Sequence, residues 1–261
     1  MMTRLFGPNA DRNLNVLIKG ESQGLIMTYA EKKWGDCSKA VAYQFNFVKL
    51  VYRYSADCYN DYFYLCPKCK NEVEQKKDYE YPKSSFPKNK DYYLLDTYDS
   101  GVSEKLKNDM LEFGIAESNF RPIYSRKHNE ILGYQVTPKN MLPSITENNA
   151  ERQIFYCEHC KIKKFEVDDS YFDAYNRLGC PVYISKEAFD KMEHINCLDG
   201  EVGSYTVIIS LELYNYLIEK YPRLECRPVF IGNVKDDPEY KRLNQSAVKN
   251  DDEIIWPECR S

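Results

Sequence analysis

The chain has 261 residues, 43% of them hydrophobic, and carries a formal net charge of −4 with an isoelectric point near 5.6. This apolar content excludes a disordered chain and predicts a globular protein with one large core or two small ones. The acidic balance argues against nucleic-acid binding, which usually needs a basic face. No apolar run is long enough to cross a bilayer, and MMTRLFGPNADRN lacks the apolar core of a signal peptide. We therefore expect a cytoplasmic protein whose ten cysteines stay reduced.

The first sixty residues contain two segments that are typical of strands. GLIMTYAEKKW and VAYQFNFVKLVYRY are rich in β-branched and aromatic residues. We expect both to form strands that pack on the rest of the protein.

Two CxxC pairs, each in a context typical of a hairpin, stand far apart in the chain. Cys66 and Cys69 follow the aromatic run YFYL. Cys157 and Cys160 follow IFY. Each pair can aim two thiolates at one ion, and a structural zinc needs four ligands. We therefore predict that all four sulfurs bind one Zn²⁺ in a tetrahedral site. The long intervening chain does not forbid this, because each doubling of a loop costs only about 0.6 kcal/mol.

The alternatives to a shared site are two unrelated turns or one redox-active pair. A redox CxxC usually starts a helix in a thioredoxin-like βαβ setting, which neither segment resembles. We expect His159, inside the second pair, to point outward, and His194 to be an ordinary histidine. The other six cysteines show no ligand spacing and are interpreted as mostly buried small hydrophobic residues: Cys37, Cys58, Cys180, Cys197, Cys226 and Cys259.

The segment between the two pairs predicts a loop, a helix and a hairpin. DYEYPKSSFPKNKDYY is rich in proline, serine and lysine and is typical of a loop. Ser103 is a suitable N-cap for a helix whose apolar residues recur at helical spacing until Gly114 ends it. FRPIYS and EILGYQVTP then predict two strands joined by the turn SRKHNE.

The C-terminal part repeats this pattern. When Ser103 is aligned with Ser210, the apolar positions of the two predicted helices coincide. After a shift of one residue, RPIY at 121–124 coincides with RPVF at 227–230. A weaker third instance, PVYISKEAFDKM, begins a helix after Ser185. The sequence therefore predicts repeated strand–helix–strand units.

These elements together predict an α+β fold. We expect short antiparallel strands, serine-capped helices, and a zinc-ribbon-like four-cysteine site that joins distant segments. The expected divisions are a strand-rich segment at 1–60, a split zinc ribbon at 61–165 with an α+β insert at about 90–145, α+β units at 166–232, and a polar tail at 233–261.

The order of these features resembles two groups of bacterial proteins, the double-CxxC proteins and the immunity proteins of polymorphic toxin systems. The matching elements are the two CxxC pairs, GVSEKLKNDMLEFGI, VIISLELYNYLIEK and the opening LFGPNADRNLNV. The sequence departs from the double-CxxC group in having Lys70 and Lys161 where a glycine often follows each pair. The resemblance implies a non-catalytic protein that binds and neutralises a cognate toxin.

A search for catalytic motifs finds no GxSxG, HExxH or P-loop. His128 and Glu130 fit the first half of the zinc deaminase signature, but Tyr156 stands where its proline belongs. A zinc ion with four cysteine ligands leaves no position for a reactive water. We therefore expect a protein that is not an enzyme.

Three classes of function are compatible with these observations. The first is toxin neutralisation through tyrosine-rich acidic segments, since tyrosine is enriched at interfaces. The second is a zinc-ribbon nucleic-acid-binding or regulatory protein, with lysines near the CxxC pairs on phosphates. The third is an enzyme of another type, which a deep polar pocket would favour. For the first, the candidate partner contacts are Asp57, Tyr59, Asp61, Tyr79, Glu80 and Tyr81.

Overall fold

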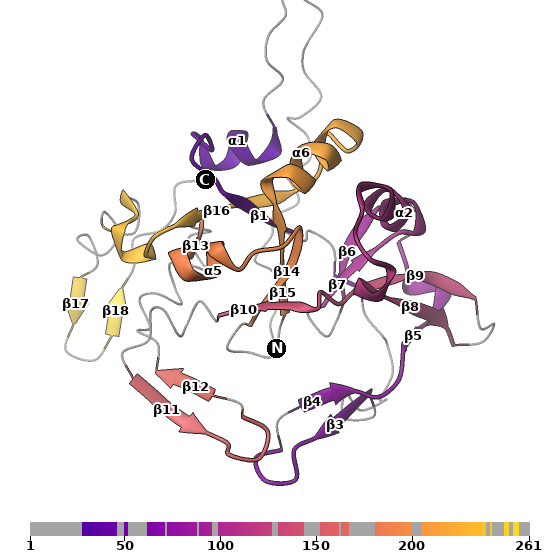
Figure 1. Cartoon of the computed structure of the whole chain (residues 1–261), viewed down its shortest axis with the longest axis horizontal. Coiled ribbons are helices and arrows are strands. Elements are labelled where there is room, and N and C mark those ends of the chain that lie inside the picture. Colours follow the sequence, from indigo (N-terminus) through magenta and orange to yellow (C-terminus); the bar gives the residue numbers. More distant parts are fainter. Residues whose placement is uncertain are drawn as a thin grey trace, which may run out of the picture.

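The computed structural model describes residues 28–45, 50–51, 62–70, 72–87, 89–95, 99–126, 130–143, 152–161, 163–166, 181–199, 205–238, 241, 248–250 and 253–255. These residues form an α+β fold with two six-stranded sheets, a few helices and separate two-stranded hairpins (Figure 1). The predicted α+β class is confirmed. The sheets are mixed, however, whereas the sequence predicted antiparallel strands.

The first sheet has parallel pairs at both edges and antiparallel pairs between them. Its strands, in spatial order, are β10 (Asn140–Leu142), β14 (Ile195–Asp199), β15 (Tyr205–Ser210), β1 (Ala42–Phe45), β16 (Cys226–Ile231) and β13 (Val182–Ile184).

The second sheet has the same succession of parallel and antiparallel pairs. Its strands, in spatial order, are β2 (Leu50–Val51), β6 (Tyr92–Leu95), β7 (Ser100–Val102), β9 (Ile131–Val136), β8 (Phe120–Ser125) and β5 (Tyr79–Tyr81).

The register of the inner strands is also the same in the two sheets. Tyr43 of β1 lies opposite Pro228 of β16, and Tyr134 of β9 lies opposite Pro122 of β8. β1 precedes all the other strands of its sheet in the chain, whereas β9 follows all those of its own sheet. β1 thus joins strands that lie far along the chain, whereas β9 pairs with β8, which directly precedes it.

Two ten-residue helices follow the corresponding strands of the two sheets. They are α2 (Glu104–Phe113) and α6 (Leu211–Lys220). The hydroxyl oxygens of Ser103 and Ser210 accept the backbone N–H of the third helical residue, so both predicted N-caps are confirmed. Gly114 ends α2 with φ +112°, in the left-handed region that glycine adopts readily. Ser185 likewise caps α5 (Lys186–Asp190).

The prediction of a strand over GLIMTYAEKKW is wrong for its C-terminal half. Residues 29–34 form helix α1 (Tyr29–Trp34), and the first part of the segment lies outside the described residues. Thr28 and Glu31 form a reciprocal capping box that satisfies the free N–H groups of the first turn. This local interaction outweighs the strand propensity of the aromatic residues. The remaining short elements are η2 (Lys83–Ser85), η3 (Glu117–Asn119), η4 (Val234–Asp236), β17 (Val248–Asn250) and β18 (Glu253–Ile255).

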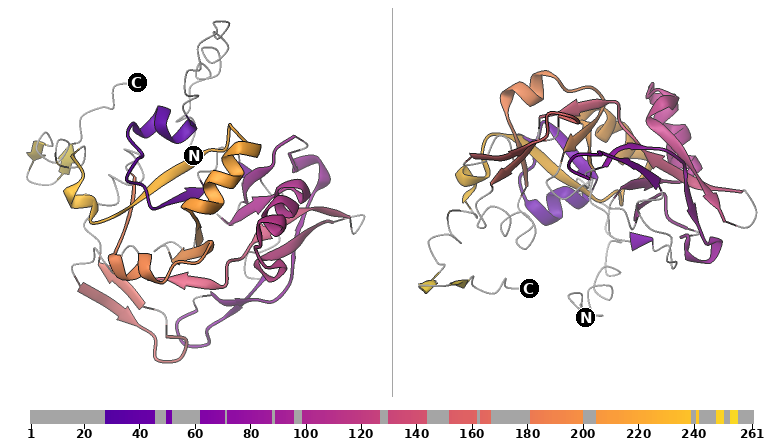
Figure 2. Two further views of the ribbon diagram at one scale, coloured as in Figure 1. Left: turned by 45° about the horizontal axis from the view of Figure 1, so that its top comes forward. Right: turned by 90° about the horizontal axis from the view of Figure 1, so that it is seen from below.

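The main hydrophobic core lies between the two halves of the protein. α2 and α6 lie side by side in Figures 1 and 2, and their buried leucines and methionine share one cluster. The rings of Tyr43 and Tyr214 stack in it with centroids 3.6 Å apart. At the helix surface, Lys220 Nζ lies 2.8 Å from carboxylate oxygens of both Asp109 and Glu112. The two halves are therefore joined by a core and by ion pairs.

Candidate metal centre

Each CxxC pair lies at the end of a two-stranded hairpin. The first hairpin consists of β3 (Phe63–Leu65) and β4 (Glu72–Gln75), and the second of β11 (Arg152–Tyr156) and β12 (Lys163–Glu166). In Figure 1 the two hairpins lie at the lower edge of the molecule with their ends together. The predicted hairpin context of both pairs is confirmed.

The residue after each pair has a backbone conformation that favours glycine. Lys70 has φ 62° and Lys161 has φ 64°, and no other non-glycine residue in the described part of the chain has a positive φ. Their N–H groups donate to the carbonyls of Cys66 and Cys157 over 2.9 and 2.7 Å. These are the positions where the sequence departs from the double-CxxC pattern. Lysine is accommodated there at a cost of about 1 kcal/mol.

The hairpins bring the four sulfurs into one cluster, as predicted. The Sγ atoms of Cys66, Cys69, Cys157 and Cys160 all lie within 4.8 Å of one another. Two of the distances between hairpins are 3.7 and 3.5 Å. A tetrahedron with metal–sulfur bonds of about 2.3 Å has edges of about 3.8 Å, whereas a disulfide is about 2.05 Å long. The geometry therefore suits a tetrahedral ion with four sulfur ligands.

Backbone N–H groups inside each turn prepare the thiols for binding. The N–H of Cys69 is the largest cause that lowers the pKa of Cys66, to about 6, and the N–H of Lys68 adds to it. The pKa of Cys157 is lowered in the same way, chiefly by the N–H of Cys160. Hydrogen bonds to sulfur favour the thiolate, which is the form that coordinates metal.

The other described cysteines belong to the protein interior. Cys37, Cys197 and Cys226 are buried, as predicted for small hydrophobic residues. Burial raises the pKa of Cys226 well above its ordinary value, so it stays a neutral thiol. The remaining three lie outside the described residues: Cys58, Cys180 and Cys259.

The predicted partner contacts need one correction. Tyr79 and Tyr81 are both 0% exposed, because alternation along β5 turns them into a core with Phe86 and Tyr93. They cannot contact a partner, whereas Glu80 between them is exposed. The other three candidates, Asp57, Tyr59 and Asp61, lie outside the described residues.

The structure places His194, for which the sequence showed no partner, beside a helix N-cap. Its Nδ1 lies 3.0 Å from the hydroxyl oxygen of Ser210. In the other half, the hydroxyl of Ser103 donates to Asp91 over 2.9 Å at the corresponding place. Because an aspartate serves equally well there, the contact between histidine and serine supports the N-cap and is not evidence of a nucleophile. The alignment of Ser103 with Ser210 was the sequence signal that could have predicted the contact between His194 and Ser210.

Comparisons with protein-family models, curated protein sequences and solved structures found no match. Among the described helices, none has the length and apolar character that crossing a membrane requires.

Proposed function

We propose that the four-cysteine centre binds one Zn²⁺ and that this ion is structural. Four thiolates complete a tetrahedral shell and leave no position for a water or a substrate. The deaminase interpretation needs only two cysteines and a histidine on the metal. Cys157 and Cys160 instead share their cluster with Cys66 and Cys69. The centre thus resembles a zinc ribbon divided between two distant segments.

We infer further that the chain contains two copies of one unit. The equal sheet orders, the equal register at Tyr43 and Tyr134, and the two serine-capped helices support this. Each copy contributes one hairpin to the metal centre. With the copies taken as β1–β8 and β9–β16, each copy also contributes its first strand to the sheet of the other. A metal shared between copies stabilises their relative position.

We propose that the protein is a non-catalytic, immunity-type protein that neutralises a cognate bacterial toxin by binding to it in the cytoplasm. The four-cysteine cluster is the observation that supports this proposal, because a metal with four sulfur ligands would stabilise the fold and would not catalyse a reaction. The net charge of −4 and the resemblance of the sequence to immunity families add to it. An acidic protein is suited to cover the basic groove of a toxin that acts on nucleic acids.

Co-expression with a toxin encoded beside this protein's gene tests the proposal. Protection should require an equimolar amount of this protein and should coincide with a stable complex. Cys66→Ser should reduce protection in proportion to the loss of folded protein, and Cys226→Ala should retain both zinc and protection. Protection at far below equimolar amounts would show turnover and would refute the binding model.

A second candidate function, nucleic-acid binding, is favoured by one observation on the hairpins. Tyr64 and Tyr156 are 58% and 42% exposed, and lysines lie beside them. Exposed aromatic rings beside cations can stack on single-stranded bases. Fluorescence anisotropy with a labelled single-stranded oligonucleotide decides between the two. Micromolar binding that falls with salt and with Tyr64→Ala would favour this function over toxin neutralisation.

A further inference from the structure

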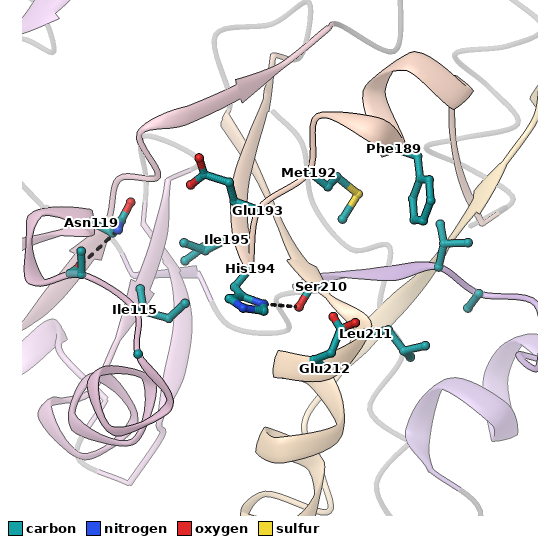
Figure 3. A pocket seen from close by; sticks show the side chains of 14 residues that line it. Ile115, Asn119, Phe189, Met192, Glu193, His194, Ile195, Ser210, Leu211 and Glu212 are labelled. Carbon is teal, nitrogen blue, oxygen red and sulfur yellow. Dashed lines mark hydrogen bonds between the residues drawn. The ribbon is translucent and has the colours of Figure 1, made fainter.

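A pocket of about 750 Å³ opens between the two halves of the protein, next to the start of α6 (Figure 3). Ile115 and Ile195 are buried side chains of its wall. Glu193 and Glu212 also line it and are exposed to solvent. No lysine or arginine is among its described lining residues. A concave site of this size with a few polar groups is typical of a ligand pocket.

The pocket exists because the two ends of the helix pair are closed differently. α2 and α6 run antiparallel, so the C-terminus of each helix lies near the N-terminus of the other. At one end the C-cap of α6 is Tyr221, whose hydroxyl lies 2.8 Å from Lys105 Nζ near the start of α2. At the other end the C-cap of α2 is Gly114, which has no side chain. A Cβ at Gly114 would have no atom within 4 Å. The pocket therefore corresponds in position to the space that Tyr221 fills at the other end of the helix pair.

The charges at the two ends are also reversed. The residue two positions after each capping serine is Lys105 at the filled end and Glu212 at the open end. The residue two positions before β6 is Lys90, at the filled end, and the residue two positions before β14 is Glu193, at the open end. The same backbone arrangement therefore accepts either charge. The backbone arrangement therefore does not dictate the two glutamates, and the carboxylate of Glu212 also accepts hydrogen bonds from its own backbone N–H and from Ser210.

The open end carries the carboxylates of Glu193 and Glu212, and the imidazole of His194 lies beside them as the one basic side chain among the described lining residues. The backbone N–H of Glu212 and then the hydroxyl of Ser210 lower the pKa of the Glu212 carboxyl, so it is ionised at neutral pH. At the filled end the ammonium of Lys105 lies 4.1 Å from the centre of the Tyr221 ring. At the open end the carboxylate of Glu212 stands where Lys105 stands at the filled end. A ligand that fills the space corresponding to Tyr221 and pairs with this carboxylate needs an apolar stem and a cationic end.

We propose that this pocket binds an arginine or lysine side chain presented by a partner protein. The stem of that side chain would lie over Ile115 and Ile195, and its charged end would lie between Glu193 and Glu212. The volume also admits the residues that flank it in the partner chain. This deepens the proposed function, on which it rests for the identity of the partner as the toxin.

A nuclear magnetic resonance titration of the full chain tests the pocket without the toxin. The probes are Nα-acetyl-arginine methylamide, the uncharged citrulline analogue, and agmatine as a free amine without a peptide backbone. We expect the arginine probe to shift the amide signals of Gly114, Ile115 and Glu212. The citrulline analogue should bind at least tenfold more weakly, and agmatine should bind more weakly than the capped arginine.

Variants connect binding to the two carboxylates. The double variant Glu193→Gln and Glu212→Gln should weaken arginine binding at least tenfold with an unchanged melting temperature. Glu219→Gln, an exposed glutamate on α6 outside the pocket, is the matched control and should have no effect. Ala116→Trp should block the pocket by filling it.

Three results would overturn the proposal: equal binding of the citrulline analogue, binding that survives the double variant, or no shift at millimolar arginine probe. If agmatine binds as tightly as the capped arginine, the occupant of the pocket is a free amine and not a partner side chain. Arginine binding without toxin protection would refute the proposed function and leave the pocket standing. Toxin protection without arginine binding would refute the pocket proposal and leave the proposed function standing.

Discussion

Cys66→Ser is the substitution that tests the metal centre most directly. A serine hydroxyl does not replace a thiolate as a zinc ligand, so the variant should lose its bound zinc. The proposed ion would link Cys66 to Cys157, which are 91 positions apart. Without the link, the unfolded chain regains the entropy that closing this loop removed.

The size of the effect follows from the length of that loop. The chain-entropy relation for a cross-link that closes 91 residues gives about 4–5 kcal/mol at 25 °C. The total stability of a domain is roughly 5–15 kcal/mol. Loss of the link should therefore remove a large share of the free energy of unfolding. The hairpins should loosen first, because the main core between α2 and α6 does not contain the cysteine ligands.

Three measurements check this prediction. Elemental analysis should find one zinc per wild-type chain and none in Cys66→Ser. Urea unfolding should show the loss of stability, and hydrogen exchange should accelerate at 62–77 and 152–166 before the sheets. Cys226→Ala removes a buried thiol that is not a ligand, so it should keep one zinc per chain. Full zinc occupancy in Cys66→Ser, or unchanged stability after zinc is lost, would refute the reasoning.

The other predictions concern the backbone, the packing and the helix pair. Lys70→Gly should be more stable than Lys70→Ala by about 1 kcal/mol in urea unfolding, because only glycine adopts this positive φ without strain; equal stabilities would contradict it. Gly133→Ala should cost about 1–3 kcal/mol, since its Cβ would overlap the buried Tyr93 hydroxyl; an unchanged thermal midpoint would show that the ring moves aside. The hydrogen bond from Lys220 is the largest cause that lowers the pKa of Asp109, so this pair stabilises the fold near neutral pH and loses that effect as pH falls below roughly 4. The stability difference between wild type and Lys220→Met, measured by urea unfolding from pH 7 downward, should therefore shrink in acid, and a constant difference would exclude the pair as its source.

Local chemistry in the sequence determined the ends of the helices and the four-cysteine cluster. Ser103 and Gly114 mark the limits of α2 because capping involves only neighbouring backbone groups. The CxxC spacing predicted the tight turns for the same reason, and four such thiols predicted one shared site. The capping box at Thr28 and Glu31 was an equally local signal that strand propensity concealed.

Pairing between distant segments was decided only by the tertiary structure. Alternation in a strand shows which side chains share a face, but not which strand lies next to it or what covers that face. Tyr79 and Tyr81 could therefore be placed on one face of a strand, yet their burial depends on Phe86, β6 and β8 packing around them. The place of β1 in its sheet rests on hydrogen bonds to β15 and β16, which lie more than 160 positions further along the chain. The pocket beside Gly114 likewise arises where the C-terminus of α2 lies next to the N-terminus of the antiparallel helix α6, an arrangement that neither helix sequence specifies by itself.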